Sequence, residues 1–296
     1  MEITVNRYQK IFFWKYLGHL FPFSRFFRNK TAVIGATIII LFVLVGMLAP
    51  WLTSYAPESI DLSATFQKPS GKHWAGTDNL GRDIFARIIF GSRISIITGV
   101  LSLIIALTFG IPIGLVAGHF GGFWDGLLMR VMDIMLSFPS ILLAIAIVVV
   151  LGPGLGNAII AVGIASIPMF ARLVRGQVLQ IRELEFIEAA RATGESHLSI
   201  MYRFLLPNCL PVLIIQSTLR IATAVLVASG LSFLSLGAQP PTPEWGAMLS
   251  EGREFIRSAP HLTFLPGLAL MTFILVFNLF ADGLIDVLNP KVHDGK

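Results

Sequence analysis

Long uncharged, apolar runs constrain this chain more than any other feature of its sequence. No Asp, Glu, Lys or Arg occurs in residues 31–57, 94–124, 134–171, 204–219, 221–243 or 258–281. A helix of about 20 apolar residues crosses a bilayer, and backbone polar groups in lipid must be satisfied within the protein. Hydrophobic residues make up 55% of the chain, charged residues 13%, and the mean hydropathy is +0.77. The sequence therefore predicts an all-α membrane protein rather than a soluble domain.

The apolar runs predict six transmembrane helices. Gly152-Pro153-Gly154 divides the longest run into two helices joined by a tight turn. Arg220 interrupts two runs that we treat as one helix beginning after Pro211. The expected spans lie at about residues 31–52, 94–118, 129–150, 157–175, 212–237 and 262–285.

Lys and Arg lie mostly on one side of these spans. Residues 1–30 mix six of them with aromatic side chains, which fits either an amphipathic segment in the anionic headgroup layer or an ordinary cytoplasmic tail. With Arg130, five arginines between 172 and 203 and two tail lysines, this side has fourteen cations and the other has seven. Both termini are therefore expected in the cytoplasm. The net charge of +5 reflects topology, and no nucleic-acid partner is expected.

The sequence lacks the motifs of several functional classes. Cys209 is the single cysteine and the six histidines lack ligand spacing, so neither an internal disulfide nor a metal site is expected. Gly71-Lys72 lacks the rest of a phosphate-binding loop, and residues 230–234 lack the second glycine of a nucleophile elbow. The chain is expected to be a non-enzymatic subunit that binds no cofactor itself. The first apolar run is too long for a signal-peptide core, and no cleaved leader is expected.

A polar, charged patch lies between the apolar runs at residues 172–208. It contains five arginines and four glutamates. Glu188 near a helix start and Arg191 three residues later favour a short helix, and Gly194 permits a left-handed turn after it. A plain helical hairpin would have a similar composition, but an ordered polar patch at a membrane surface is typical of a contact with another protein.

The spacing within this patch is specific. Glu188-Ala189-Ala190 is followed after three residues by Gly194 and after nine more by Phe204, one further residue and Leu206-Pro207. The pattern resembles the cytoplasmic coupling loop of the permeases of bacterial ATP-binding-cassette (ABC) importers, with Phe204 in place of the usual Ile. The resemblance implies that residues 176–208 form the loop that contacts an ATPase.

Two further motifs lie on the opposite side of the membrane in the expected topology. The first runs Gly76-Thr77-Asp78-Asn79-Leu80-Gly81-Arg82-Asp83, and the second runs Pro240-Pro241-Thr242-Pro243-Glu244-Trp245-Gly246-Ala247-Met248. Composition alone predicts a folded loop with a capped helix for the first, in which Gly76 and Gly81 allow tight turns, and places Trp245 at the outer membrane interface. Both motifs, together with residues 278–283, resemble the dipeptide, oligopeptide, nickel and glutathione branch of these permeases.

The resemblance covers residues 31–292 and implies one permease domain with the type I ABC importer fold. It implies a multi-pass subunit of the bacterial cytoplasmic membrane for ATP-driven import of short peptides or glutathione, with nickel or a metal chelate as the alternative cargo. The implied partners are a second, homologous permease, two cytoplasmic ATPase subunits that carry ATP and Mg, and an extracytoplasmic substrate-binding protein. An ion-coupled secondary transporter is the alternative of a different class, and it would need charged intramembrane sites, of which the spans offer few.

Two charged positions within the spans leave alternatives open. Arg220 lies roughly 14 Å into its expected helix. It could line the translocation cavity, pair with Asp282 or Asp286, or extend its side chain to the interface. Asp133 is expected to act as a cap or to pair with Arg130.

Gly110, Gly114 and Gly118 recur at four-residue intervals in the second expected span. Small residues at this spacing let another helix approach closely. That helix belongs either to the same chain or to another subunit.

Overall fold

The computed structural model describes residues 23–288, which form a bundle of helices and contain no strand beyond an isolated bridge between Thr77 and Asp83. The long helices are α3 (Lys30–Met47), α5 (Ile84–Phe120), α8 (Leu155–Ile181), α11 (Leu206–Phe233) and α13 (His261–Leu288). The shorter ones are α2 (Phe23–Arg28), α4 (Ala49–Leu52), α6 (Gly122–Leu136), α7 (Ser140–Leu151), α9 (Glu185–Ala192), α10 (His197–Ser199) and α12 (Trp245–Gly252). Single turns are η1 (Leu62–Ala64), η2 (Ile200–Leu205, of π type) and η3 (Arg253–Phe255).

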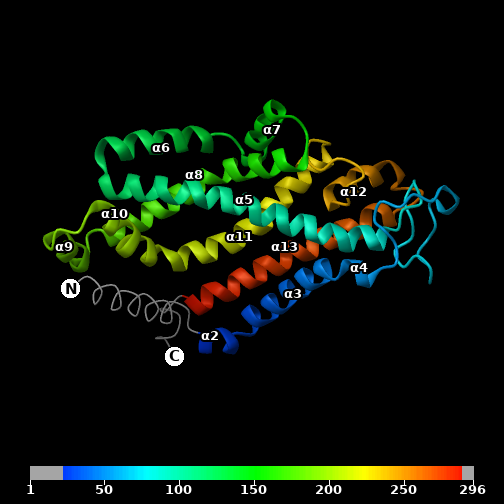
Figure 1. The fold of residues 1–296 in the computed structure, drawn as a ribbon, viewed down its shortest axis with the longest axis horizontal. Helices are drawn as coiled ribbons and strands as arrows, with labels where there is room; N and C mark the ends of the chain where they lie inside the picture. The colour runs from blue at the N-terminus through cyan, green and yellow to red at the C-terminus, as the bar shows by residue number, and fades with distance from the viewer. Residues whose placement is uncertain (1–22, 289–296) are drawn as a thin grey trace.

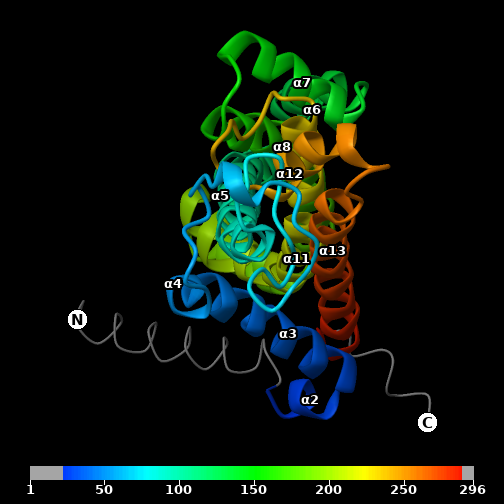
Figure 2. The same cartoon turned by 90° about the vertical axis from the view of Figure 1, so that its right-hand side faces the viewer.

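The long helices run along the longest axis of the molecule (Figure 1). The segment 53–83 and α12 lie at one end of this axis, and α9 and α10 lie at the other. Figure 2 views the bundle from the end of segment 53–83, with α3 and α13 on one side and α6 and α7 on the opposite side. We call these ends the loop end and the α9 end. Residues 1–22 of the expected N-terminal amphipathic segment lie outside the described residues.

Side-chain caps set where several helices begin. Asn29 Oδ1 accepts from the Ala32 amide at the start of α3, at 2.9 Å. Asp83 Oδ2 accepts from the Ala86 amide at the start of α5, at 2.8 Å, and Glu244 Oε2 accepts from the Ala247 amide at the start of α12, at 2.9 Å. Each cap satisfies a backbone donor that the first turn of a helix leaves without a partner.

Small residues bring α5 and α8 into close contact. A Cβ at Gly114 would lie 2.5 Å from the Ala171 carbonyl oxygen, and one at Gly118 would lie 2.7 Å from Val178 Cβ. On the other helix, Gly163 would meet Ile105 in the same way. The glycine stripe of α5 therefore packs against α8 of the same chain, which decides between the two alternatives that the sequence left open.

The apolar runs predicted the number of spans better than their shape. Among residues 23–288, five helices are long and apolar enough to cross a membrane, or six if α6 and α7 count as one broken span. The expectation of one continuous helix over 129–150 is wrong, because α6 and α7 meet at an angle of 91°. The chain bends at Pro139, which has no amide N–H to continue the helix, after the Ser137 amide has donated to the Asp133 carbonyl.

Two further boundaries differ from expectation. Helix α5 begins at Ile84, ten residues before the expected start at 94, because Asp83 caps it there and charged residues do not end a helix. The expected start of the fifth span after Pro211 is also wrong, because α11 begins at Leu206 and runs through this proline. Helices in membranes tolerate such prolines. The break at residues 152–154 is confirmed, since α7 ends at Leu151 and α8 begins at Leu155.

Candidate functional site

The short helix predicted at Glu188 is α9. Ile187 and Ala190 face inward and join the core that α5, α8 and η2 share, while Glu188, Ala189 and Arg191 are exposed. Ala190 thus anchors the helix instead of adding to its outer surface. Glu185 and Glu188 lie in the first turn and Arg191 in the last, which matches the partial charges at the two helix ends. Helix α9 is therefore anchored by its buried face, and its acidic first turn is exposed and accessible to a partner.

Gly194 makes the turn that the sequence predicted. Its φ is +79°, its amide donates to the Arg191 carbonyl at 3.0 Å, and the amide of Glu195 returns to the Ala190 carbonyl at 3.1 Å. A glycine occupies this left-handed conformation without a steric penalty. Nothing lies within 4 Å of where its Cβ would be, so the turn is exposed on its side-chain face.

Helices α9 and α10, joined by the turn at Gly194, form a helical hairpin that we call the α9 hairpin. The rest of the motif anchors this hairpin to the bundle. Pro207 is buried, and Phe204 and Leu206 pack partly buried against the same core that receives Ile187. Arg182 Nη1 donates to the Gly118 carbonyl of α5 at 2.9 Å. The motif therefore divides into an outer half, at Glu188, Ala189 and Gly194, and an inner half that anchors it.

A histidine pair also links α5 to this hairpin. His119 Nε2 and His197 Nδ1 lie 2.9 Å apart, with ring centroids separated by 5.2 Å. The two residues are 78 positions apart, and neither belongs to a spacing pattern, so their contact could not be predicted from the sequence.

The loop-end motif builds a tight fold around two glycines. Gly76 and Gly81 have φ values of +78° and +72°, as their expected turns require. A Cβ at Gly81 would lie 1.8 Å from the Asp61 carbonyl oxygen, so the chain passes where only glycine fits. Thr77 Oγ1 donates to the Ala64 carbonyl, which draws segment 53–66 over the motif. The hydroxyl and the amide of Ser63 both donate to Asp61 and lower the pKa of that carboxyl.

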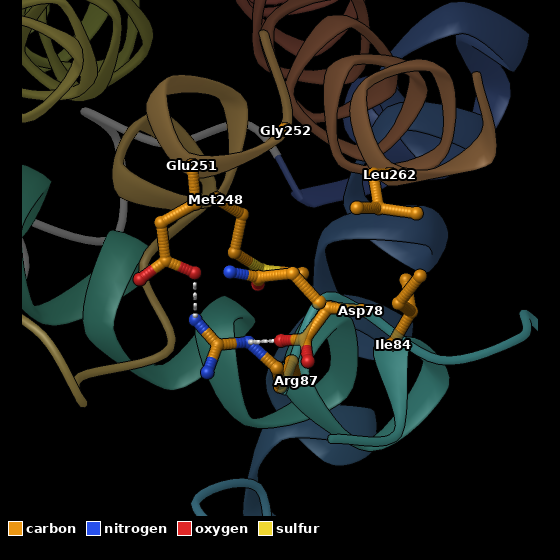
Figure 3. Close-up of a pocket in the computed structure, with 8 residues that line it drawn as sticks. Asp78, Ile84, Arg87, Met248, Glu251, Gly252 and Leu262 are labelled. Atoms are coloured by element: carbon orange, nitrogen blue, oxygen red, sulfur yellow. Dashed lines mark hydrogen bonds and ion pairs between the residues drawn. The ribbon is translucent and has the colours of Figure 1, made fainter. Parts of the chain in front are cut away.

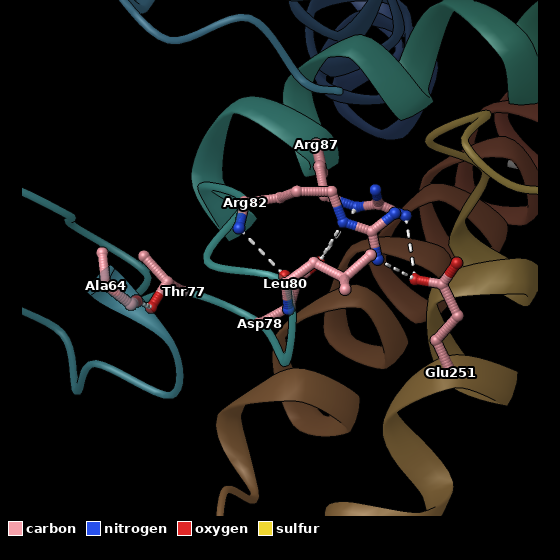
Figure 4. A network of polar contacts seen from close by, with 7 residues as sticks. All are labelled: Ala64, Thr77, Asp78, Leu80, Arg82, Arg87 and Glu251. Carbon is pink, nitrogen blue, oxygen red and sulfur yellow. Dashed lines mark hydrogen bonds and ion pairs between the residues drawn. The ribbon is translucent and has the colours of Figure 1, made fainter. Parts of the chain in front are cut away.

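A buried cluster of four charged side chains lies beneath this turn. Arg82 Nε donates to Asp78 Oδ2 at 2.6 Å, and Arg82 Nη2 donates to Glu251 Oε2 on α12 at 2.7 Å (Figure 4). Arg87 Nη2 reaches the same Glu251 oxygen at 3.1 Å (Figure 3). The two guanidinium side chains are 3% and 1% exposed. Two cations and two carboxylates compensate one another, which buried charges require.

The cluster leaves little free space. The cavity beside Asp78, Arg87 and Glu251 has a volume of about 10 Å³, roughly what one water molecule needs (Figure 3). His73 Nδ1 lies 2.9 Å from Asp83 Oδ1, and Asp83 also caps α5. These contacts are structural ties, and the cavity beside the four charged side chains is too small for a substrate.

The proline-rich motif closes the loop end from α12. Trp245 is fully buried, and its Nε1 donates to the Ile88 carbonyl at 3.0 Å. Its expected place at the membrane interface is therefore wrong, since a partner for the indole N–H lets the ring pack inside against Phe42 and Phe273. Glu244 is buried and accepts from Ser229 at 2.6 Å. The motif's exposed members are Pro240 and Pro241, whereas Pro243 is buried.

Two aspartates of α6 pair with arginines of α8 rather than with residues of their own helix. Asp133 pairs with Arg172 of α8, so the expected pair with Arg130 is wrong, because α8 lies alongside α6 and presents its own arginines. Arg175 donates to both carboxylate oxygens of Asp125 at 2.5 and 2.6 Å. Sequence spacing favours local partners and does not reveal these contacts.

Arg220 does not pair with either carboxylate that the sequence offered. Within residues 23–288, no ion pair joins it to Asp282 or Asp286, and its Nη2 contacts the sulfur of Met169 on α8. Asp286 accepts instead from Asn29 Nδ2 at 3.2 Å. The two aspartates lie in the last turns of α13, whereas Arg220 lies at the middle of α11, so the helices hold them apart along the bundle.

Comparison with known proteins identifies the family. The profile of the binding-protein-dependent transport system inner membrane component family matches residues 110–294. The chain belongs to this family. The profile of the N-terminal transmembrane domain of oligopeptide transport permease C matches residues 20–69. This permease is accordingly a multi-pass protein of the bacterial inner membrane.

Its relatives include named permeases of known type. The dipeptide transport system permease protein DppC of Alkalihalophilus pseudofirmus is 49% identical over 270 residues, which cover 91% of this chain and 89% of the relative. The glutathione transport system permease protein GsiD of Escherichia coli is 47% identical over 269 residues, with coverages of 90% and 89%. GsiD of Pectobacterium atrosepticum is 43% identical over the same length.

A solved structure shares the fold. An inward-facing structure of the MetNI methionine ABC transporter has a chain that aligns with a TM-score of 0.56 at 20% identity, covering 70% of this permease and 98% of that chain. The expected ABC importer permease fold is thereby confirmed.

Proposed function

We propose that this permease is one of two homologous membrane subunits of an ATP-driven importer of short peptides, such as dipeptides or glutathione. The observation that carries the proposal is the exposed, acidic first turn of α9, anchored by Ile187 and followed by the turn at Gly194. The names of the similar permeases, for dipeptide and glutathione transport, support the choice of cargo.

The other subunits complete the machine. Two cytoplasmic ATPase subunits bind ATP and Mg and contact the α9 hairpin, and a binding protein delivers cargo at the loop end. Helix α5 and the η2–α11 segment contact the hairpin, so they carry its displacement into the bundle and change access from one side of the membrane to the other. This chain contributes the path and no catalytic group.

Charge reversal at α9 tests the coupling role. Glu188→Lys should leave the permease inserted and folded, because the side chain is exposed, but should weaken binding of the ATPase subunits and abolish ATP-driven uptake. Glu254→Lys, an exposed reversal at the loop end, is the matched control for ATPase binding. The readouts are co-purification of the ATPase and peptide uptake in proteoliposomes. Normal values for Glu188→Lys would remove the coupling assignment, and uptake of nickel in place of peptide would change the cargo.

The proposed topology puts Gly194 in the cytoplasm and Gly76, Gly154 and Trp245 on the outer side. Gly76 and Trp245 are buried, so exposed neighbours serve better for labelling. After replacement of Cys209, single cysteines at Lys68 and Gln239 should react with an impermeant thiol reagent in intact cells, and one at Glu195 should not. Labelling of position 195 from outside would overturn the topology.

A further inference from the structure

Arg220 is a cation at the centre of a long apolar helix. It follows Leu206 by fourteen residues and precedes Phe233 by thirteen, so it lies about 20 Å along the axis from either end of α11. A side chain in this position cannot reach the membrane surface by extending along the helix. The alternative in which Arg220 extends its side chain to the membrane interface is therefore excluded, because the interface is too far away.

Three other arginines on the helices of the bundle have carboxylate partners. Arg172 pairs with Asp133, Arg175 with Asp125, and Arg87 with Glu251. Arg220 instead contacts the sulfur of Met169, an uncharged and weak acceptor, and its Nε is buried without a hydrogen-bond partner. Its charge is left uncompensated by the described part of the chain.

The surroundings of Arg220 form a polar stripe on α11. Gln216 and Thr223 lie one turn before and one turn after it, and Gln216 Nε2 is 3.5 Å from the same Met169 sulfur. Arg220 and Gln216 are partly buried and Thr223 is exposed, so the stripe opens onto a surface of the chain. A polar stripe at this depth is costly against lipid and must face water or protein.

We infer that Arg220 binds the carboxylate of the transported peptide as it passes the middle of the membrane. The inference rests on the proposed function, since it names the group of the cargo that this chain recognises. A guanidinium offers two parallel N–H donors, which match the two oxygens of a carboxylate. Met169 has a flexible thioether side chain that yields its place readily.

The same features let the cargo leave. A carboxylate paired with a partly exposed guanidinium gains only a modest net free energy, because water competes for both charges. The site therefore holds the peptide only in passing, as a transport path requires. A fixed acidic partner, such as those of Arg172 and Arg175, would block this exchange.

Uptake of an acid and its amide tests the inference. The assembled transporter is reconstituted in proteoliposomes, and its binding protein is saturated in turn with a tripeptide and with the C-terminal amide of that tripeptide. With the native permease, the free acid should enter about tenfold faster than the amide. Arg220→Gln should bring this ratio near one, and Arg220→Lys should keep part of it. Arg130→Gln, which removes an exposed cation from α6, should leave the ratio unchanged.

A cross-linking measurement keeps the inference testable if uptake is lost altogether. A tripeptide with a photoreactive C-terminal residue should form an adduct with α11 between residues 213 and 227 in the native complex, and Arg220→Gln should reduce that adduct about tenfold. No adduct with α11 in the native complex would overturn the inference.

Three other results are decisive. A native acid-to-amide ratio in Arg220→Gln would overturn the inference. So would failure of Arg220→Gln to assemble while Arg220→Lys assembles, because Arg220 would then pair with a carboxylate of the second permease. If the native complex imports neither peptide, the proposed function itself fails, whereas equal native uptake of acid and amide removes only the role of Arg220.

Discussion

At the loop end of the bundle, a cluster of four charged side chains is largely buried and paired, whereas the charged side chains of α9 are exposed. Asp78, Arg82, Arg87 and Glu251 form ion pairs with one another inside the fold, and Arg87 Nη1 alone among the cluster's buried polar atoms has no hydrogen-bond partner among residues 23–288. Glu188 and Arg191 of α9 point outward, and no ion pair joins them in the described chain. The glycines repeat the contrast, since Gly81 is pressed against a backbone carbonyl and Gly194 has open space around it.

The difference separates what the chain completes alone from what it leaves for a partner. Buried charges that are paired across elements fix one arrangement of segment 53–83 on α12, and removing any member leaves an uncompensated charge. Exposed charges on a small anchored helix cost little and remain free to bind. Mutations should accordingly damage folding at the loop end and coupling at the α9 end.

Asp78→Ala should have the largest effect on stability. It removes the partner of Arg82 and also the acceptor for the amides of Leu80 and Arg82, and should lower the free energy of unfolding by about 3–5 kcal/mol. Thermal unfolding in detergent can be followed by the reaction of a thiol dye with Cys209, which is buried and the single cysteine. Asp61→Ala, an exposed cap in the same segment, is the control and should cost much less. Equal losses would show that the cluster is not the source of stability.

Paired glycine substitutions compare the two ends directly. Gly81→Ala places a Cβ against the Asp61 carbonyl at a positive φ, and should cost about 3 kcal/mol. Gly194→Ala has the same backbone strain without the contact, and should cost about 1 kcal/mol. The same thiol-dye unfolding curve measures both. The contrast between the ends breaks down if Gly194→Ala is the more damaging of the two.

Trp245→Phe should have an intermediate effect at the loop end. It removes the hydrogen bond to the Ile88 carbonyl and part of a fully buried ring, for a loss of about 1–2 kcal/mol. Unfolding in detergent again provides the measure. If Trp245 lay at the membrane interface instead, the substitution would leave the unfolding midpoint unchanged.

Glu188→Gln should have the smallest effect on folding. The carboxylate is exposed in the first turn of α9, so neutralising it should change the free energy of unfolding by no more than about 0.5 kcal/mol. Uptake should fall nonetheless, because the ATPase meets this turn in the proposed function. A loss of stability as large as that of Trp245→Phe would mean that the Glu188 carboxylate contributes to the folded state and is not simply exposed.

The sequence predicted features that short segments control. The turns at Gly81 and Gly194 and the helix at Glu188 follow from neighbouring residues, and the structure contains all three. Partners distant in sequence were missed. Glu251 lies 169 positions from Arg82, and no local pattern connects them.

Burial and bending were the other sources of error. Trp245 was expected at an interface because an isolated tryptophan prefers one, but Ile88 supplies an acceptor inside the fold. Hydropathy contains no information on the direction in which a helix runs, so it could not predict the bend between α6 and α7. The coupling role of α9 and the cargo remain predictions, because they concern contacts with other molecules.

The length of α5 has a consequence for where the loop end stands. Its 37 residues extend about 55 Å, whereas the hydrocarbon core of a bilayer is about 30 Å thick. Arg93 is exposed in the third turn, and an exposed cation is costly in hydrocarbon, so the first three turns lie outside the hydrocarbon. These turns are about 15 Å long, so they place the folded loop beyond the lipid headgroups. A soluble protein can then bind the loop end without displacing lipid.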